Sequence, residues 1–203
     1  PLVYCRLAKQ FSYKKVNNPN HRAAAANGQW LLMSRIAYDA VGGHSAVRDA
    51  ILDDIALARR VKQTGCRLYF ARGTDIATTR MYQRFEEMWQ GWSKNLFLWF
   101  DRRRWTVAWA AGAAALDAAT LVVTLTALAS GWRLVAGIAA GLLVFRHLQY
   151  AAALLRNHYP LSSLFYYEIA NALVAAMMLN SARKYLRGEP VEWKGRHYAI
   201  TTH

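Results

Sequence analysis

The feature that most limits how this chain can fold is the apolar sequence that fills its second half. Residues 105–129 form a long apolar run whose only charge is Asp117. Two further apolar segments follow at 133–155 and 161–180. About 20 apolar residues are enough to cross the hydrocarbon core of a bilayer. The three segments therefore predict an all-α bundle of transmembrane helices in a multi-pass membrane protein.

A few ionisable residues interrupt these segments, namely Asp117, Arg146 and Glu168. A charge at this depth is costly unless it faces the interior of the bundle or lies near the interface. One interpretation pairs the two acids with Arg146 or Lys184 or places them near the interface, and the other has them contact a lipid headgroup. The sequence leaves both open.

Basic residues flank the apolar block. The formal net charge is +14, with Arg102–Arg104 before the first segment and Arg183, Lys184 and Arg187 after the last. Cations at the edges of apolar spans favour the cytoplasmic side and anionic lipid as a partner rather than nucleic acid. We therefore expect a protein of the cell inner (plasma) membrane with its water-facing N-terminal portion in the cytoplasm. Three full spans would put the two basic ends on opposite sides, so one segment could instead be re-entrant or interfacial.

The sequence predicts four parts, which are residues 1–80, 81–104, 105–182 and 183–203. The first is a water-facing region and the last is a basic tail. The second combines Trp89, Trp92, Phe97 and Trp99 with nearby cations, which is typical of an amphipathic helix lying in the headgroup layer. An ordinary domain helix with aromatic core contacts is the alternative.

The water-facing region shows an alternation of strand and helix patterns. Residues 29–34 and 67–71 have the length and composition of strands. Between them lie a short helical stretch at 35–41, which Gly42-Gly43 would end, and an amphipathic helix at 51–62 that Gly65 would stop. This order predicts an α/β layer.

Asp53 and Asp54 lie in the first turn of the predicted helix 51–62. Acids there complement the helix dipole and cap free N–H groups. A carboxylate at a helix N-terminus can also project into a cleft and serve as a general base. The residues alone do not decide between helix capping and a general base.

No metal site is predicted within the chain. Cys5 and Cys66 have no CxxC partner, and the histidines form no HxxH or HExxH pattern. The chain begins at Pro1 rather than Met, so we interpret it as processed or truncated.

Several short motifs occur in one order along the chain. They are Asn27–Trp30, Gly42-Gly43-His44, Leu52–Arg60, Arg80-Met81-Tyr82 and Gly91–Asn95, with Trp193–Tyr198 in the tail. Together they resemble the family-2 glycosyltransferases, and most of all the membrane-bound branch associated with hopanoid and carotenoid biosynthesis. The resemblance implies the C-terminal portion of a GT-A-like nucleotide-diphospho-sugar transferase domain, an α/β fold, followed by the helix bundle.

The resemblance also implies roles for individual residues. Asp54 matches the aspartate that serves as the general base, and Asp53 stands where glutamate is usual. Gly42, Gly43 and His44 match the acceptor-side loop.

Contact with the donor diphosphate is expected on the interfacial helix. Trp89 matches the tryptophan of the family's (Gln/Arg)xxArgTrp motif, but Met88 stands where arginine is expected. The resemblance therefore assigns this contact to Arg80, Arg84 or Lys94.

The function that these residues imply is transfer of a sugar from a nucleotide-diphosphate donor to a membrane lipid or isoprenoid-type acceptor. The family's Asp-x-Asp motif, which would hold Mg²⁺ or Mn²⁺, does not occur in this sequence. We therefore expect a C-terminal fragment that by itself binds neither metal nor nucleotide sugar competently. The alternatives are a degenerate transferase and a non-catalytic membrane scaffold or transporter-like subunit, in which Asp117, Arg146 and Glu168 would line a polar path.

Overall fold

The chain folds into two compact units, each described by itself below. The computed structural model describes residues 1–8, 12–73, 76–77, 79–100, 102–193 and 196–198. One unit, which we call the membrane unit, comprises Pro1–Leu7 and Trp92–Val191. The other, which we call the α4 unit, comprises Ala8–Gly91 and Glu192–Tyr198.

The α4 unit is built around one amphipathic helix, α4 (Asp53–Gln63). Its other helices are α2 (Tyr13–Asn17), α3 (Arg35–Ala40) and the 3₁₀ helix η1 (His44–Val47). A small core joins α4 to η1 and to the end of α3. Its buried members are Val41, Val47, Leu57 and Val61.

The predicted α/β layer is wrong. Residues 29–34 and 67–71 form no strands, and the only sheet in the described part of the chain is a hairpin of β1 (Val191–Trp193) and β2 (Arg196–Tyr198). Side chains in both stretches nevertheless alternate in direction, because Leu31, Met33 and Leu68 pack on the core while Leu32 and Tyr69 are 85% and 82% exposed. A strand also needs a neighbouring backbone to pair with, and neither stretch has one.

The stretch 67–71 is instead held by a side chain. The Asn17 amide donates to the Phe70 carbonyl oxygen at 3.1 Å and accepts from the Phe70 N–H at 2.7 Å. This pair reproduces the two hydrogen bonds of an antiparallel residue pair. The side chain of Asn17 therefore satisfies the backbone N–H and carbonyl groups of Phe70 without a sheet.

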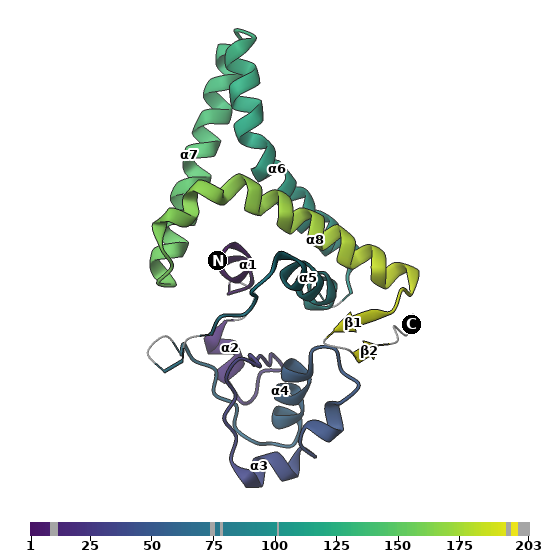
Figure 1. Ribbon diagram of the computed structural model, residues 1–203. Coiled ribbons are helices and arrows are strands. Elements are labelled where there is room, and N and C mark those ends of the chain that lie inside the picture. The colour runs from purple at the N-terminus through teal and green to yellow at the C-terminus, as the bar shows by residue number, and fades with distance from the viewer. Residues whose placement is uncertain (9–11, 74–75, 78, 101, 194–195, 199–203) are drawn as a thin grey trace. The chain divides into compact units, whose positions relative to one another are not determined.

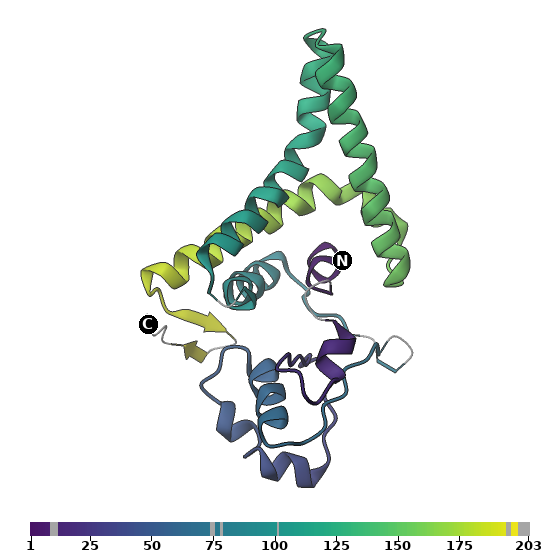
Figure 2. The ribbon, with the colours of Figure 1, turned by 180° about the vertical axis from the view of Figure 1, so that it is seen from behind.

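The membrane unit contains an antiparallel helical hairpin. It consists of α6 (Arg104–Ala129) and α7 (Arg133–Arg156), which lie side by side and are joined at Gly131 (Figures 1 and 2). Gly131 has φ +74°, a left-handed conformation that suits glycine at a helix end. The short α1 (Leu2–Ala8) also belongs largely to this unit.

The last long helix, α8 (Tyr167–Arg187), follows the 3₁₀ helix η2 (Leu161–Tyr166). It packs along α6 and begins partway along the hairpin rather than at its end (Figures 1 and 2). The second half of α5 (Phe85–Trp99) packs against the end of α8, where the Ser181 hydroxyl accepts a hydrogen bond from the Phe97 N–H at 2.9 Å. The second half of α5 is therefore joined to α8, which in turn packs along α6.

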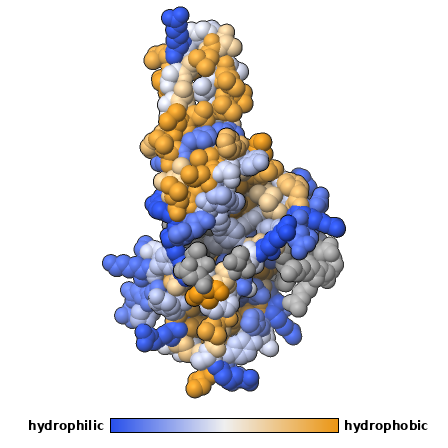
Figure 3. Space-filling model, turned by 60° about the vertical axis from the view of Figure 1, so that its left-hand side comes forward, coloured by the Kyte–Doolittle hydropathy of each residue, from blue (hydrophilic) through white to orange (hydrophobic). Residues whose placement is uncertain are grey.

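The surface of this unit is apolar where a membrane would cover it. Apolar residues gather over the helical hairpin in the space-filling view (Figure 3), and Leu134, Ile138 and Leu148 are each more than 60% exposed. Three segments among the described residues, Arg104–Ala129, Arg133–Arg156 and Leu161–Arg187, are long and apolar enough to cross a bilayer. The chain is a membrane protein.

Candidate active site

The carboxylate of Asp54 is fixed from two sides at the start of α4. Its Oδ2 accepts a hydrogen bond from the backbone N–H of Gly28 at 2.9 Å. Its Oδ1 accepts from the N–H of Ile55 at 2.8 Å. The side chain is partly exposed. A loop that lies 26 residues earlier in the chain thus helps to aim a solvent-accessible carboxylate.

Asp53 is the more exposed of the two acids. Its Oδ1 accepts from the N–H of Asp54 at 3.0 Å, and the N-cap residue Leu52 makes no side-chain cap. The two aspartates therefore satisfy free N–H groups at the positive end of α4. Capping and a chemical role are compatible, because a carboxylate oxygen has a second lone pair after one hydrogen bond.

The predicted acceptor-side loop lies between α3 and η1. Gly42 has φ +79° and Gly43 has φ +56°, so both use backbone conformations that other residues rarely adopt. A Cβ on Gly43 would lie 2.6 Å from the ring of Tyr38. The Tyr38 hydroxyl accepts from the His44 N–H at 3.1 Å and lies 2.9 Å from His44 Nδ1. The glycines thus allow Tyr38 to orient the His44 imidazole.

The Gly42–His44 loop and Asp54 are both positioned by α4, but at different points along the helix axis. Arg60 Nε donates to the Val41 carbonyl oxygen at 2.9 Å and so ties the end of α3 to α4. Arg60 follows Asp54 by six positions, or about 9 Å along the helix axis. The Gly42–His44 loop is therefore anchored more than one turn away from the predicted base.

The residues expected to contact the donor diphosphate divide between the two units. Arg80 and Arg84 are exposed in the α4 unit, where Trp89 packs against Phe85 with ring centroids 6.1 Å apart. Lys94 belongs to the membrane unit and is buried, and its carbonyl oxygen accepts from the Tyr185 hydroxyl at 2.8 Å. No single site that includes all four emerges within either unit.

Tyr82 is a close neighbour of α5 that the sequence did not single out by itself. A Cβ on Gly91 would lie 2.5 Å from the Tyr82 hydroxyl oxygen. Burial raises the pKa of Tyr82 to about 12. The phenol is therefore neutral at physiological pH, and Gly91 makes room for it beside the first turns of α5.

Lys62 is a second residue whose role the sequence did not reveal. Its ammonium donates to the carbonyl oxygens of Asn18, His21 and Ala23 at 2.9, 2.8 and 2.7 Å. The sequence pattern placed Lys62 only at the end of the predicted amphipathic helix 51–62. These three hydrogen bonds attach residues 18–23 to the C-terminal end of α4, opposite the end that carries Asp54.

The charges inside the apolar segments of the membrane unit form a connected cluster. Arg146 Nε lies 3.4 Å from Asp117 Oδ1, and the Tyr167 hydroxyl donates to Asp117 Oδ2 at 3.2 Å. The predicted pairing of Asp117 with Arg146 is thus confirmed. Glu168 instead faces His147, with Nε2 and Oε1 3.3 Å apart, so its predicted pairing with Arg146 or Lys184 is wrong.

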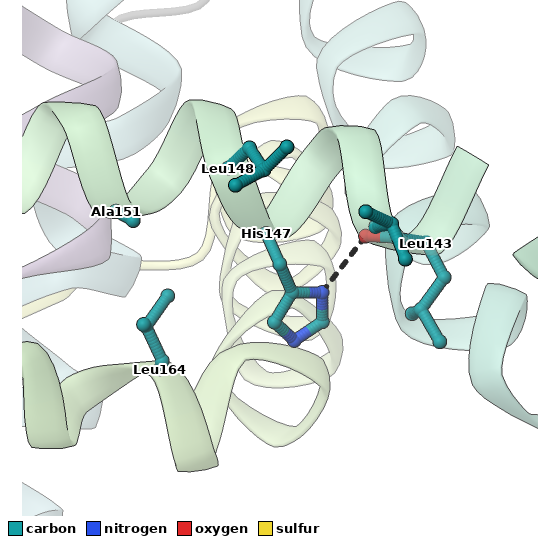
Figure 4. A pocket seen from close by; sticks show the side chains of 6 residues that line it. Leu143, His147, Leu148, Ala151 and Leu164 are labelled. Carbon is teal, nitrogen blue, oxygen red and sulfur yellow. Dashed lines mark hydrogen bonds between the residues drawn. The ribbon is translucent and has the colours of Figure 1, made fainter. Parts of the chain in front are cut away.

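His147 also borders a cavity between α7 and η2. The cavity has a volume of about 300 Å³ and is lined by Leu143, Val144, His147, Leu148, Ala151 and Leu164. Figure 4 shows the imidazole turned toward the Leu143 carbonyl, with Nδ1 and that oxygen 2.9 Å apart. Both ring nitrogens therefore have partners, and the cavity walls are otherwise aliphatic.

The described residues contain no group of three or more His, Cys, Asp or Glu that could hold a metal ion. Asp53 and Asp54 are the only adjacent acids at the candidate site, and both already accept hydrogen bonds from helix N–H groups. These residues do not fit a divalent cation. The Mg²⁺ or Mn²⁺ implied by the resemblance remains a prediction.

Comparison with known families decides what kind of protein carries this site. The family model described as glycosyl transferase family 21 matches residues 10–203. The chain belongs to glycosyl transferase family 21. No curated protein and no solved structure shows a significant match to it.

Membership of family 21 settles part of the sequence-based interpretation. The expected glycosyltransferase is confirmed at the level of the family. The matching family is family 21 rather than family 2, and the match carries no support for the hopanoid and carotenoid branch. The match, which covers residues 10–203, favours a transferase over the scaffold or transporter-like subunit.

Proposed function

We propose that this family 21 transferase moves a sugar from a nucleotide-diphosphate donor to the hydroxyl group of a membrane lipid or isoprenoid-type acceptor, with Asp54 as the general base. The observation that carries the proposal is the fixed and accessible carboxylate of Asp54. Gly28 holds one of its oxygens and Ile55 the other. The family match supplies the reaction class.

The chemistry needs a base in such a position. An alcohol is a poor nucleophile, so a carboxylate must take its proton as the oxygen attacks the anomeric carbon of the sugar. The bond from that carbon to the diphosphate oxygen breaks, and the nucleoside diphosphate leaves with the electron pair. The two N–H donors hold the carboxylate of Asp54 in place at the start of α4, where it is partly exposed and can approach the acceptor's hydroxyl.

Other residues support this step in the proposal. Asp53 keeps a second negative charge beside the base at the helix N-terminus. Gly42, Gly43 and His44 provide an acceptor-side loop, in which Tyr38 orients the imidazole. Arg80 and Arg84 are exposed cations that can stabilise the leaving diphosphate. Lys94 is buried, so its contribution requires contact inside the membrane unit.

The lipid acceptor is proposed from the membrane unit. A chain with three apolar helices of spanning length holds its transferase region at the surface where lipid hydroxyl groups are concentrated. Binding the enzyme and the acceptor to one surface raises their effective concentration. The donor sugar and the lipid are to be identified by assay.

The test is a transfer assay on the full-length protein in membranes. Radiolabelled nucleotide sugars are offered in turn, and label in the lipid extract is measured for wild type, Asp54→Asn and Asp49→Asn. Asp49 is an exposed acid outside α4, so it controls for loss of one negative charge. We expect Asp54→Asn to lose most of the transfer and Asp49→Asn to keep it. Equal transfer by all three would reject Asp54 as the base, and no transfer by folded wild type would favour a degenerate transferase.

A further inference from the structure

The start of α8 lies at mid-height in the helical hairpin. The Tyr167 hydroxyl bonds to Asp117 near the middle of α6, at 3.2 Å. The neighbouring Glu168 faces His147 in the middle part of α7 at 3.3 Å. The first two residues of α8 are thus tied to the centres of both hairpin helices. The helix begins inside the bundle rather than at either end of it.

The other end of α8 lies beside the chain segment that leads into α6. Asn180 donates to the Ser93 hydroxyl at 3.0 Å, and the Tyr185 hydroxyl donates to the Lys94 carbonyl at 2.8 Å. Ser93 and Lys94 belong to α5, which ends shortly before Arg104 begins α6. The C-terminal end of α8 is therefore level with the start of α6.

These contacts fix the path of the third apolar segment. The helix α7 descends from the hairpin turn to Arg156, η2 leads back up, and α8 runs from mid-height down to the level at which α6 began (Figures 1 and 2). The segment enters and leaves on one side. This geometry is internal to the membrane unit.

We propose that Leu161–Arg187 is re-entrant rather than spanning, so that the basic ends of α6 and α8 face the same leaflet and together bind its anionic headgroups. Two full spans and one re-entrant segment return the chain to its starting side. Three full spans would separate the basic ends, against the tendency of cations to collect on one side. The proposal concerns how the membrane unit sits in the bilayer and does not depend on Asp54.

The charges at these two ends suit an anionic lipid surface. Arg103 and Arg104 are exposed at the start of α6, and Arg183 and Arg187 are 59% and 65% exposed near the end of α8. Glu189 lies 3.7 and 3.8 Å from the last two and offsets only part of their charge. Clustered arginines beside a membrane helix attract anionic phospholipid headgroups.

The topology is tested by cysteine labelling in the full-length protein, with its other cysteines replaced by alanine. Single cysteines are introduced at three exposed positions, Thr79 before α5, Ser130 at the hairpin turn and Pro190 after α8. Each is exposed to a membrane-impermeant maleimide in right-side-out and inverted vesicles. We expect Pro190→Cys to label from the same side as Thr79→Cys and Ser130→Cys from the opposite side. Labelling of Pro190→Cys together with Ser130→Cys would show a full span and overturn the proposal.

The lipid preference is tested by native mass spectrometry of protein purified from bilayers of equal phosphatidylglycerol and phosphatidylcholine. The double variant Arg103→Gln/Arg187→Gln removes one cation from each end, and Arg35→Gln/Arg48→Gln removes two exposed cations from the α4 unit as a matched control. We expect the first variant to retain at least threefold less phosphatidylglycerol than wild type and the control to match wild type. Equal retention by all three would overturn the shared headgroup surface.

Discussion

The two units of this chain are stabilised in different ways. In the membrane unit, long helices bury small apolar and hydroxyl residues against one another, and a few charges are paired between helices. In the α4 unit, one short helix carries a small core, and individual polar contacts hold the extended segments to it. Stability should therefore depend on charge pairing in the first unit and on single backbone contacts in the second.

The largest expected loss of stability comes from breaking the Asp117–Arg146 pair. Asp117→Leu removes the buried acid that faces Arg146. Losing one partner of a fully buried pair costs about 3–5 kcal/mol, and because the Arg146 side chain is 39% exposed we expect a loss at or below the lower end of that range. Thermal unfolding of the detergent-solubilised protein measures the effect. Replacing both residues with leucine should recover much of the loss. If the single variant is as stable as wild type, charge pairing does not stabilise this unit.

In the α4 unit the largest effect is expected at Gly43. Gly43→Ala combines a positive φ with a Cβ 2.6 Å from the Tyr38 ring, and we expect a cost of about 2 kcal/mol, within the range for backbone strain. Gly65→Ala is the matched control, because Gly65 also has positive φ (+76°) and its Cβ would meet nothing within 4 Å. Chemical denaturation should show a greater loss for Gly43→Ala. Equal losses would mean that the Tyr38 contact adds nothing.

A smaller loss is expected when Lys62 is changed. Lys62→Met keeps the aliphatic stem and removes three hydrogen bonds to the carbonyl oxygens of the segment 18–23. Because the side chain is partly exposed, water replaces some of these bonds, and we expect a loss of about 1 kcal/mol. Hydrogen exchange should report faster exchange in this segment and unchanged exchange in α7. Unchanged protection in both would refute the anchoring role.

The smallest effect is expected in the membrane unit at Gly112. An added Cβ there would meet nothing within 4 Å, and alanine is favoured over glycine within a helix by up to about 1 kcal/mol. Gly112→Ala should therefore leave the melting temperature unchanged or raise it slightly. A clear fall would show that a neighbouring surface needs this glycine.

The same contrast explains which features could be predicted from the sequence. Long apolar runs and the amphipathic pattern of α4 are local signals, so the spanning helices and the helix near residues 51–62 were predictable. In the stretches 29–34 and 67–71 the side chains alternate between core and solvent as they would in strands. Whether another backbone lies beside them to form a sheet is a long-range property, and a local sequence pattern does not contain it. The Asn17 contact with Phe70 is long-range in the same way.

The candidate site was predictable only in part. Asp53 and Asp54 are recognisable because acids at a helix start are a local signal, and the resemblance singled them out. The hydrogen bond from Gly28 to Asp54 joins residues far apart in the chain, and no local pattern reveals it. The same holds for the partner of Glu168, since the choice among His147, Arg146 and Lys184 depends on how the helices pack.

The most direct test of the central claim is the rate of sugar transfer to lipid by the full-length protein carrying Asp54→Asn. The amide keeps one oxygen, which can accept from either Gly28 or Ile55 but not from both in the present geometry, so the variant removes the base and one of these two hydrogen bonds. A general base contributes about 10²–10⁴-fold to a rate, and we expect a loss of that size in a variant that still unfolds cooperatively and reaches the same membrane content, with a melting temperature only slightly lower because one hydrogen bond is lost. Transfer within about twofold of wild type would contradict the assignment of Asp54 as the general base.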